Sequence, residues 1–424
     1  MPMINIFIFL ASLAVYASFG LPGLCYVAGA ILLSYVTALL TPRLRFMMWV
    51  SVAANALMLL LLKLQPITGM QLVTAVGVSY FSLQLISYNV DVWRGKYPPE
   101  KNLYRFALYV TYLPYLLKNS GPIERYDRFA VAMRQNRRLS MDGILHGGAR
   151  ALWGLFKTMV IAARLGVIIG AIKAQPDTYN GAYALAAMLL FSLQLYSEFS
   201  GSMDIVLGVS QMLGIPLSEN FDTPFFSRSF QEFWRRWHMT LGAWLKDYVY
   251  IPLGGNRKGK FRKYLNLIIT FLVSGLWHGV HYLLWGLFNG IFVCVGTRLQ
   301  TKWKTLDRIG TFLLVSLLWA FFIWTDNTLL ALKMIGSVFT TFNYAAFFST
   351  VGTMGLSVAD WSILGGALLL LWGHDLWHKR LWQWFDRRHV AIRTAVICGL
   401  VLLVLLFGMY GIGFTAEAFI YSQY

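Results

Sequence analysis

The chain carries the stretch Ser227-Arg-Ser-Phe-Gln-Glu-Phe-Trp-Arg-Arg-Trp-His238 and, further on, the stretch Gly275-Leu-Trp-His-Gly279. Each stretch sets a histidine, His238 or His278, among aromatic and apolar residues. A titratable ring at bilayer depth costs free energy unless it has a partner or a function. The rest of the sequence therefore has to establish whether these two histidines lie in a membrane.

The composition predicts an integral membrane protein. Of 424 residues, 58% are hydrophobic and only 13% are charged, whereas soluble proteins carry about 25% charged residues. The mean hydropathy is +0.58. Apolar runs of about 20 residues recur and are long enough to cross a bilayer as helices. Examples are Met3–Gly20, Leu21–Leu40, Phe46–Lys63 and Val396–Phe414.

The predicted fold class is all-α, because the alternating segments of a membrane β-barrel are missing from the sequence. We expect about eleven transmembrane helices at roughly 20 residues per crossing. Residues 1–424 read as a single polytopic membrane domain, with no repeat and no soluble part. Met3–Gly20 lacks the basic start and the cleavage site of a signal peptide, so we expect it to remain as the first span.

The net charge of +18 does not indicate a nucleic-acid partner. The basic residues cluster in short loops between apolar runs, where Lys and Arg orient a protein in the lipid bilayer. Most of these loops are expected to be cytoplasmic. The main clusters are Arg43 with Arg45, 134–138, 257–263, 302–308 and 379–393.

The segment from Phe221 to Lys263 differs from the predicted spans. It contains Pro224, Pro252 and two adjacent glycines, and it is amphipathic in its middle. No run within it is long and apolar enough for a simple crossing. We therefore expect re-entrant or interfacial helices here.

His278 lies between two apolar runs, and glycines at 275 and 279 would let a backbone or a substrate approach it closely. From the residues alone, the ring is either catalytic or a buried histidine held by an interhelical hydrogen bond. His281 shares its face and is expected to pack. His374 and His378 have the spacing of helical metal ligands, but no third ligand is evident, so no metal site is predicted.

His238 follows Arg235 and Arg236, whose guanidinium groups match phosphate geometry. The alternative is that these arginines belong to a loop that only sets orientation. The run Gly254-Gly-Asn-Arg-Lys-Gly259 has the composition of a phosphate-binding nest, although this signal is weak alone.

Two acids fall inside a predicted span, Glu198 and Asp204. Carboxylates commonly orient a histidine in acyl-transfer sites. Either acid can equally form an ion pair with Lys157 or Arg164, which interrupt an earlier apolar run. Both interpretations stay open at this stage.

Taken together, these segments resemble the membrane-bound O-acyltransferase superfamily, strongly over about residues 75–300 and loosely elsewhere. The likeness rests on the motifs Tyr88-Asn-Val-Asp-Val-Trp-Arg-Gly95, Gly121-Pro-Ile-Glu-Arg125, Tyr196-Ser-Glu-Phe-Ser-Gly-Ser-Met-Asp204, Glu219-Asn-Phe221, Phe226-Ser-Arg-Ser229, Phe233-Trp-Arg-Arg-Trp-His238, Trp244-Leu-Lys-Asp-Tyr248, Ile251-Pro-Leu-Gly-Gly-Asn-Arg-Lys-Gly259, Gly275-Leu-Trp-His-Gly279 and the ending Phe419-Ile-Tyr-Ser-Gln-Tyr424.

Within the superfamily, two local likenesses point to different acyl groups. The run at 252–258 is similar to membrane subunits that O-acetylate alginate and peptidoglycan, and it lies beside the candidate site. The run at 120–129 is more similar to the D-alanyl transferase of teichoic acid. Glu198 departs from the family, which usually has Asp there.

The resemblance implies a ring of helices around a central funnel or tunnel, with a thioester donor entering from the cytoplasm. It makes His278 the general base for an acceptor hydroxyl, and it makes His238 the group that positions or polarises the donor carbonyl. The donor's phosphates are expected near Arg235, Arg236, Arg257 and Lys258. Supporting roles are expected for Glu198, Asp204 and Trp277.

The first hypothesis is acetyl transfer from acetyl-CoA as cosubstrate, with no bound cofactor. The acceptor would be an extracytoplasmic polysaccharide or an esterase-like acyltransferase partner. The nearest alternative is D-alanyl transfer from the thioester of a cytoplasmic carrier protein. A second class is a transporter or channel, since broken helices and buried polar groups suit that function too. A purely structural scaffold would leave those polar groups unexplained.

Overall fold

The computed structural model describes residues 2–69, 75, 77–116, 121–134, 139–296, 300–325 and 327–410. Within these residues every regular element is a helix, apart from one isolated bridge between Phe221 and Trp237, so the all-α prediction is confirmed. Some sequence features lie outside the described residues: part of the run at 120–129, most of the basic cluster 134–138 and the ending Phe419–Tyr424.

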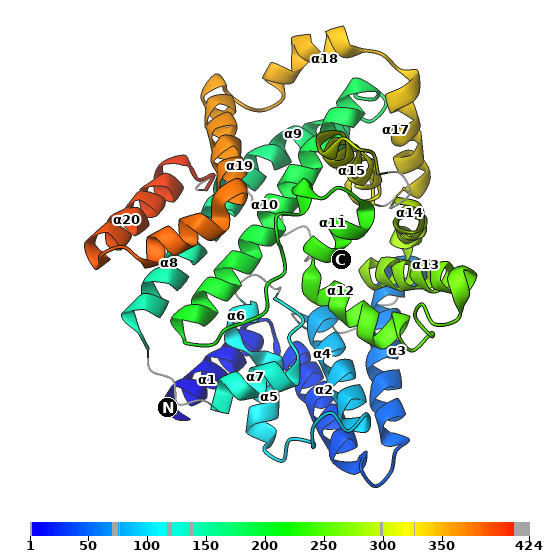
Figure 1. The fold of residues 1–424 in the computed structure, drawn as a ribbon, viewed down its shortest axis with the longest axis vertical. Coiled ribbons are helices and arrows are strands. Elements are labelled where there is room, and N and C mark those ends of the chain that lie inside the picture. Colours follow the sequence, from blue (N-terminus) through cyan, green and yellow to red (C-terminus); the bar gives the residue numbers. More distant parts are fainter. Residues whose placement is uncertain are drawn as a thin grey trace.

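The N-terminal helices form a group with an apolar core of its own (Figure 1). They are α1 (Pro2–Ser18), α2 (Leu21–Leu40), α3 (Met47–Thr68), α4 (Val78–Trp93), α5 (Leu103–Thr111), α6 (Leu113–Leu116) and α7 (Tyr126–Arg134). The bounds of α2 coincide with the predicted run. The apolar stretch that starts at Leu103 is divided between α5 and α6 at Tyr112, whose ψ of 117° leaves the helical region.

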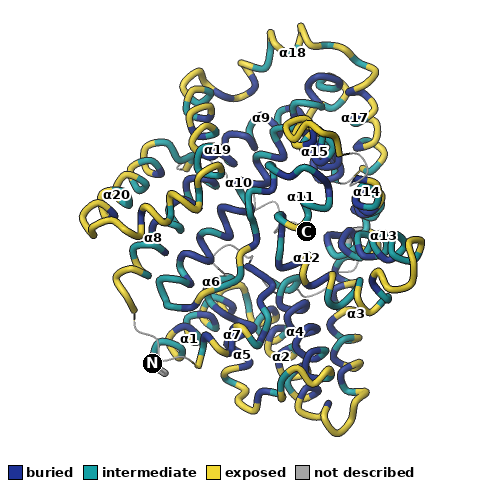
Figure 2. Tube along the Cα trace, in the orientation of Figure 1, coloured by how far each residue is buried: buried dark blue, intermediate teal, exposed yellow. Residues whose placement is uncertain are grey.

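The centre of the molecule is built from two long helical segments. The first consists of α8 (Met141–Phe156), the π-helical turn η1 (Lys157–Ala162) and α9 (Ala163–Ala174), and the second is α10 (Ala182–Met212). Figure 2 shows α10 buried along much of its length.

Glycines let α8 and α10 approach each other closely. A Cβ atom added to Gly154 would lie 2.4 Å from the carbonyl oxygen of Gly201, and one added to Gly208 would lie 2.5 Å from that of Gly147. Small residues at helix contacts are the usual way for membrane helices to pack backbone against backbone.

The segment from Phe221 to Lys263 is divided into short helices, none of which is long enough to cross a bilayer. They are η2 (Pro224–Phe226), α11 (Phe230–Arg236), α12 (Met239–Leu245) and η3 (Lys246–Tyr250). The chain then forms a helical hairpin from α13 (Gly259–His278), η4 (Val280–Tyr282) and α14 (Leu283–Val295). The start of α13 lies in a run that the sequence analysis had assigned to a basic loop.

The C-terminal part of the described chain divides around the central helices, with its first helices against α10 and its last two against α8 and η1 (Figure 1). It comprises α15 (Lys304–Leu318), α16 (Ala320–Ile323), α17 (Thr328–Thr340), α18 (Tyr344–Thr350), η6 (Val351–Thr353), α19 (Val358–Asp386) and α20 (Val390–Phe407).

Six helices among the described residues are long and apolar enough to span a membrane, or seven if the bent pair of α17 and α18 counts as one span. The expected count of about eleven is therefore not confirmed. Several predicted spans are shorter or interrupted helices, α1 and α14 among them. The multi-pass membrane character itself is confirmed.

Candidate active site

His238 lies at the turn where α11 ends and α12 begins. Its φ is 46°, a left-handed backbone conformation that residues other than glycine seldom adopt. The preceding Trp237 forms the bridge with Phe221, which fixes the chain just before the turn. The residue is 3% exposed, and its ring meets that of Phe199 edge-on at 4.9 Å. Strained backbone of this kind persists only where the surrounding contacts hold it.

The side chain of Asn220 caps α12 in place of His238, which makes no side-chain cap itself. Asn220 Oδ1 accepts hydrogen bonds from Thr240 N at 3.1 Å and from Thr240 Oγ1 at 2.7 Å. The same oxygen lies 3.4 Å from His238 Nδ1. An amide oxygen can only accept, so Nδ1 carries the proton and Nε2 keeps the lone pair. Burial lowers the pKa of His238 to about 3, which keeps this ring neutral near pH 7.

His278 ends α13 and is surrounded by aromatic rings. Its ring lies 5.5 Å from the ring of Trp285 and 5.5 Å from that of Phe322, edge-on to both. The residue is 4% exposed. Gly275 does permit a close backbone approach, as predicted, because a Cβ atom there would lie 2.5 Å from the carbonyl oxygen of Tyr282.

Trp277 joins the two histidines. Its ring centroid lies 4.7 Å from that of His278 and 6.1 Å from that of His238. The indole nitrogen donates to the carbonyl of Ser79 at 3.3 Å, which ties the ring to α4. His238 and Lys63 are both close enough to His278 to act on it electrostatically. Three of the predicted site residues therefore form one cluster.

The four predicted donor-binding residues fall into two groups. Arg235 and Arg236 occupy the last turn of α11, beside His238, and Arg236 pairs with Glu232 at 2.6 Å. Arg257 and Lys258 are exposed in the turn before α13. At 1.5 Å per residue, the 20 residues of α13 separate them from His278 by about 30 Å along the helix. If the thioester carbon of the donor lies at the histidines, Arg257 and Lys258 can contact only a part of the donor that is about 30 Å away from that carbon.

Two earlier motifs dock onto the segment that follows His238. Ile123 N donates to Thr240 Oγ1 at 3.0 Å, and Arg125 pairs with Asp247 at 3.2 Å. Tyr248 donates to Asp91 at 2.8 Å, so the motif of α4 reaches the same place. Ile123, Arg125 and Asp91 thus hold α12 and η3 in place through hydrogen bonds and an ion pair.

A polar cavity of about 500 Å³ opens beside α12. Asn220 and Met239, which contact or adjoin His238, form part of its lining. The lining is rich in charged and imidazole side chains, among them His146, Arg150, Lys157, Asp204, Glu219, Asp222, His374, Asp375, His378 and Lys379.

Asp204 takes part in an ion-pair network in this cavity. Its carboxylate pairs with Lys157 at 2.7 Å and with Arg150 at 2.9 Å. Lys157, in the first position of the π-helical turn, also donates to Ser200 at 2.7 Å. The sequence left two roles open for Asp204, orienting a histidine or pairing with a buried cation, and the structure contains the ion pair with Lys157. Arg164 pairs with Asp360 instead, and Glu198 lies half-buried on α10.

Three further histidines line the polar cavity, each beside a carboxylate, and only two of them, His374 and His378, were considered from the sequence. His146 contacts Asp386 at 2.7 Å, His374 contacts Asp375 at 3.3 Å, and His378 lies 3.8 Å from Asp222. No group of three metal-ligating side chains occurs among the described residues. The pairing of His374 with the adjacent Asp375 was visible in the sequence, but its place in a cavity was not.

Neither His238 nor His278 is itself among the residues that line this polar cavity. The aqueous passage to His278 that the family resemblance implied therefore stays a prediction.

Comparison with known proteins agrees with this assembly of motifs. The model of the membrane-bound O-acyltransferase family matches residues 30–334. The chain is 37% identical over 284 residues to a probable alginate O-acetylase of Pseudomonas putida, covering 65% of this chain and 58% of that protein. It is 32% identical to a peptidoglycan O-acetyltransferase of Helicobacter pylori, covering 60% of this chain and 54% of that protein.

A teichoic acid D-alanyltransferase of Streptococcus thermophilus is also similar, with 30% identity over 59% of this chain and 64% of that protein. In each of these three alignments the chain spans less than two thirds of its relative.

Proposed function

The chain belongs to the membrane-bound O-acyltransferase family, and we propose that it moves an acyl group from a cytoplasmic thioester to a hydroxyl group beyond the membrane. Acetyl is the group that we favour, because the identity is 37% to the probable alginate O-acetylase and 32% to the peptidoglycan O-acetyltransferase, against 30% to the teichoic acid D-alanyltransferase. The observation that carries the proposal is the cluster of His238, Trp277 and His278 beside a polar cavity.

In the proposed reaction, His278 removes the proton from the acceptor hydroxyl as its oxygen attacks the thioester carbonyl. The new C–O bond forms, the C–S bond breaks, and the proton passes to the departing thiolate. A positioned general base of this kind is worth about 10²–10⁴-fold in rate. With the proton on Nδ1, Nε2 of neutral His238 can accept a hydrogen bond from an N–H or O–H group of the donor, but it cannot donate one to the donor carbonyl.

The acceptor side of the proposal is a cell-envelope polysaccharide, reached directly or through an extracytoplasmic esterase-like acyltransferase. The donor is acetyl-CoA, whose phosphates would meet the basic residues of α11 and of the turn before α13. D-alanyl transfer from a carrier protein is the second candidate. It is favoured by the similarity to a teichoic acid D-alanyltransferase.

The proposal is tested with purified protein and membrane extract supplied with labelled acetyl-CoA, followed by mass spectrometry of the product. Replacement of His278→Ala should abolish label transfer while the amount of inserted protein stays unchanged. His281→Ala, three residues further on, is the matched control and should retain activity. Near-normal transfer by His278→Ala would remove His278 as the base. Incorporation of carrier-bound D-alanine instead of acetyl would move the assignment to the second candidate.

A further inference from the structure

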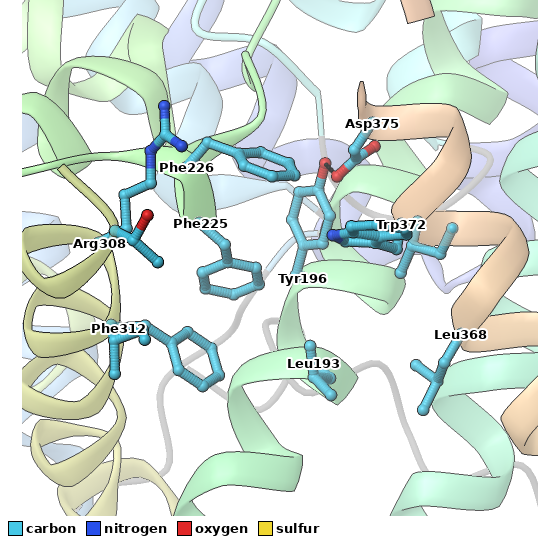
Figure 3. Close-up of a pocket in the computed structure, with 12 residues that line it drawn as sticks. Leu193, Tyr196, Phe225, Phe226, Arg308, Phe312, Leu368, Trp372 and Asp375 are labelled. Atoms are coloured by element: carbon cyan, nitrogen blue, oxygen red, sulfur yellow. Dashed lines mark hydrogen bonds between the residues drawn. The ribbon is translucent and has the colours of Figure 1, made fainter. Parts of the chain in front are cut away.

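An apolar groove of about 530 Å³ lies between α15 and α19, with α10 and the η2 segment as its floor (Figure 3). The rings of Phe225 and Phe312 meet edge-on, with 5.2 Å between their centroids. Leu193, Leu368, Leu371 and Trp372 extend the apolar lining. Neither His238 nor His278 is among the residues that line this groove.

The groove has one polar end, to which α10, α15 and α19 each contribute a polar or charged side chain. Arg308 of α15, Asp375 of α19 and Tyr196 of α10 lie toward one side of the view in Figure 3. About one turn or more further along the same helices, the lining residues are Phe312, Leu368 and Leu193. The groove therefore has the polarity of an amphiphile, with a charged head and an apolar tail.

Basic and aromatic residues of the kind found at a membrane interface flank the polar end. Helix α15 begins at Lys304 and follows Lys302 and Trp303, and basic and aromatic residues of this kind mark a membrane interface. Arg308 is four residues further on, or about 6 Å along the helix. Likewise, α19 ends in a basic and aromatic stretch, with Lys379 one turn beyond Asp375.

Exposed apolar side chains continue from the groove onto both bounding helices. Ile309 and Trp372 line the groove and are themselves exposed, and beside them lie the exposed Leu306 and Leu313 on α15 and Leu369, Leu370 and Leu376 on α19. An acyl chain can therefore enter the groove from the side.

Arg308 is the cation of the polar end, and the two neighbouring carboxylates have other partners. The neighbouring carboxylate of Asp307 is engaged by Arg228 at 2.9 Å and by Thr301, and that of Asp375 accepts from Tyr196 at 2.7 Å. Arg308 is exposed at the mouth together with Thr305. A guanidinium group there matches a phosphate diester.

We infer that the groove binds one acyl chain of an anionic phospholipid, with the headgroup phosphate against Arg308. The chain passes Phe225 and Phe312 and ends near Leu193 and Leu368. Nothing in this site depends on the acyl-transfer chemistry, so it stands or fails separately from the proposed function.

The test is native mass spectrometry of the detergent-purified protein, titrated with an equimolar mixture of phosphatidylglycerol and phosphatidylcholine. The wild type should retain one phosphatidylglycerol molecule in preference to phosphatidylcholine. Because one basic residue near a membrane surface contributes about fivefold in binding, Arg308→Gln should weaken that retention by about this factor, and Arg308→Lys should keep most of it. Leu368→Trp, which fills the groove, should abolish the adduct.

Two matched controls separate the site from general effects. Arg43→Gln removes an exposed arginine from the turn between α2 and α3, and Leu369→Trp enlarges a residue on the outer face of α19. Both should bind as the wild type does. Equal retention of the two lipids, or unchanged retention by Arg308→Gln and Leu368→Trp, overturns the inference. A dimer that Leu368→Trp dissociates would assign the groove to a second copy instead.

Discussion

Asn220 offers the sharpest test of how the site is held together. Its side chain is buried, and Asn220 Oδ1 serves Thr240 N, Thr240 Oγ1 and His238 Nδ1 at once. Replacing Asn220→Ala removes the cap of α12 and leaves a buried backbone donor without that acceptor. Loss of a cap costs about 0.5–2 kcal/mol, and an unsatisfied buried donor costs about 1–3 kcal/mol. We expect a loss of about 2–3 kcal/mol in unfolding free energy, since the two costs overlap.

The variant Asn220→Asp separates capping from tuning of the histidine. A carboxylate still accepts from Thr240, so the cap of α12 is kept, and any loss of stability comes from placing a charge at this buried position. Its negative charge beside His238 favours the imidazolium and raises the pKa of that ring from its depressed value. A ring with a raised pKa becomes protonated as pH falls, so activity should decline on the acid side, where the wild type still works.

Denaturant unfolding in detergent and the pH profile of kcat/KM for label transfer measure the two effects separately. Thr240→Val is the control: it loses the hydroxyl bonds to Asn220 and Ile123, so it should lower stability without moving the profile. Identical profiles for Asn220→Asp and the wild type, together with an unaltered stability of Asn220→Ala, would refute the assignment.

Two further predictions follow from helix packing and from the separation of the donor residues. Gly154→Ala should destabilise the protein strongly in thermal unfolding, because its methyl group would lie 2.4 Å from the carbonyl oxygen of Gly201. Gly148→Ala on the same helix meets nothing within 4 Å and should be neutral or slightly stabilising. Joint replacement of Arg257→Gln and Lys258→Gln should raise the apparent KM for the donor more than it lowers kcat; an unchanged KM would leave this turn as an orientation signal only.

The sequence predicted the fold class and several helices well, and the reason is local. The run at 21–40 is continuously apolar and ends at Thr41-Pro-Arg43, so both ends of α2 are encoded in the run itself. The start of α13 was missed because Lys260, Arg262 and Lys263 read as a loop. The first turns of an amphipathic helix can carry long charged side chains as well, so a basic cluster in the sequence does not distinguish a loop from the start of a helix.

The site was predicted only in part, because its remaining members come together through tertiary packing. The histidine motifs identified the cluster around Trp277, since each motif carries its own aromatic and glycine context. Asn220 was quoted within a motif, yet nothing in the sequence shows that it reaches over to α12. The polar cavity is lined by residues of α8, α10, the loop before η2 and α19. The hydrophobic periodicity of a single segment cannot predict contacts between segments that lie far apart in the sequence.

The network around Asp204 decides between two roles that the sequence left open. Lys157 is 3% exposed, so Asp204→Asn would leave its ammonium group buried against neutral groups, namely the new amide, the Ser200 hydroxyl and the Tyr196 ring, with no carboxylate paired to it. Breaking one side of a buried ion pair costs about 3–5 kcal/mol. The double variant Lys157→Met with Asp204→Asn removes both charges, while Arg150 keeps its paired bonds to Glu219.

We therefore expect the double variant to unfold at a higher denaturant concentration than Asp204→Asn alone, with a coupling energy of about 1–3 kcal/mol. If the carboxylate only holds the cavity wall, the second substitution should also restore much of the lost activity. If Asp204 acts on the reaction through a histidine, stability should recover while kcat stays low. Glu219→Gln, at the more exposed end of the network, should change stability less than Asp204→Asn, because water can solvate the partner that it leaves behind.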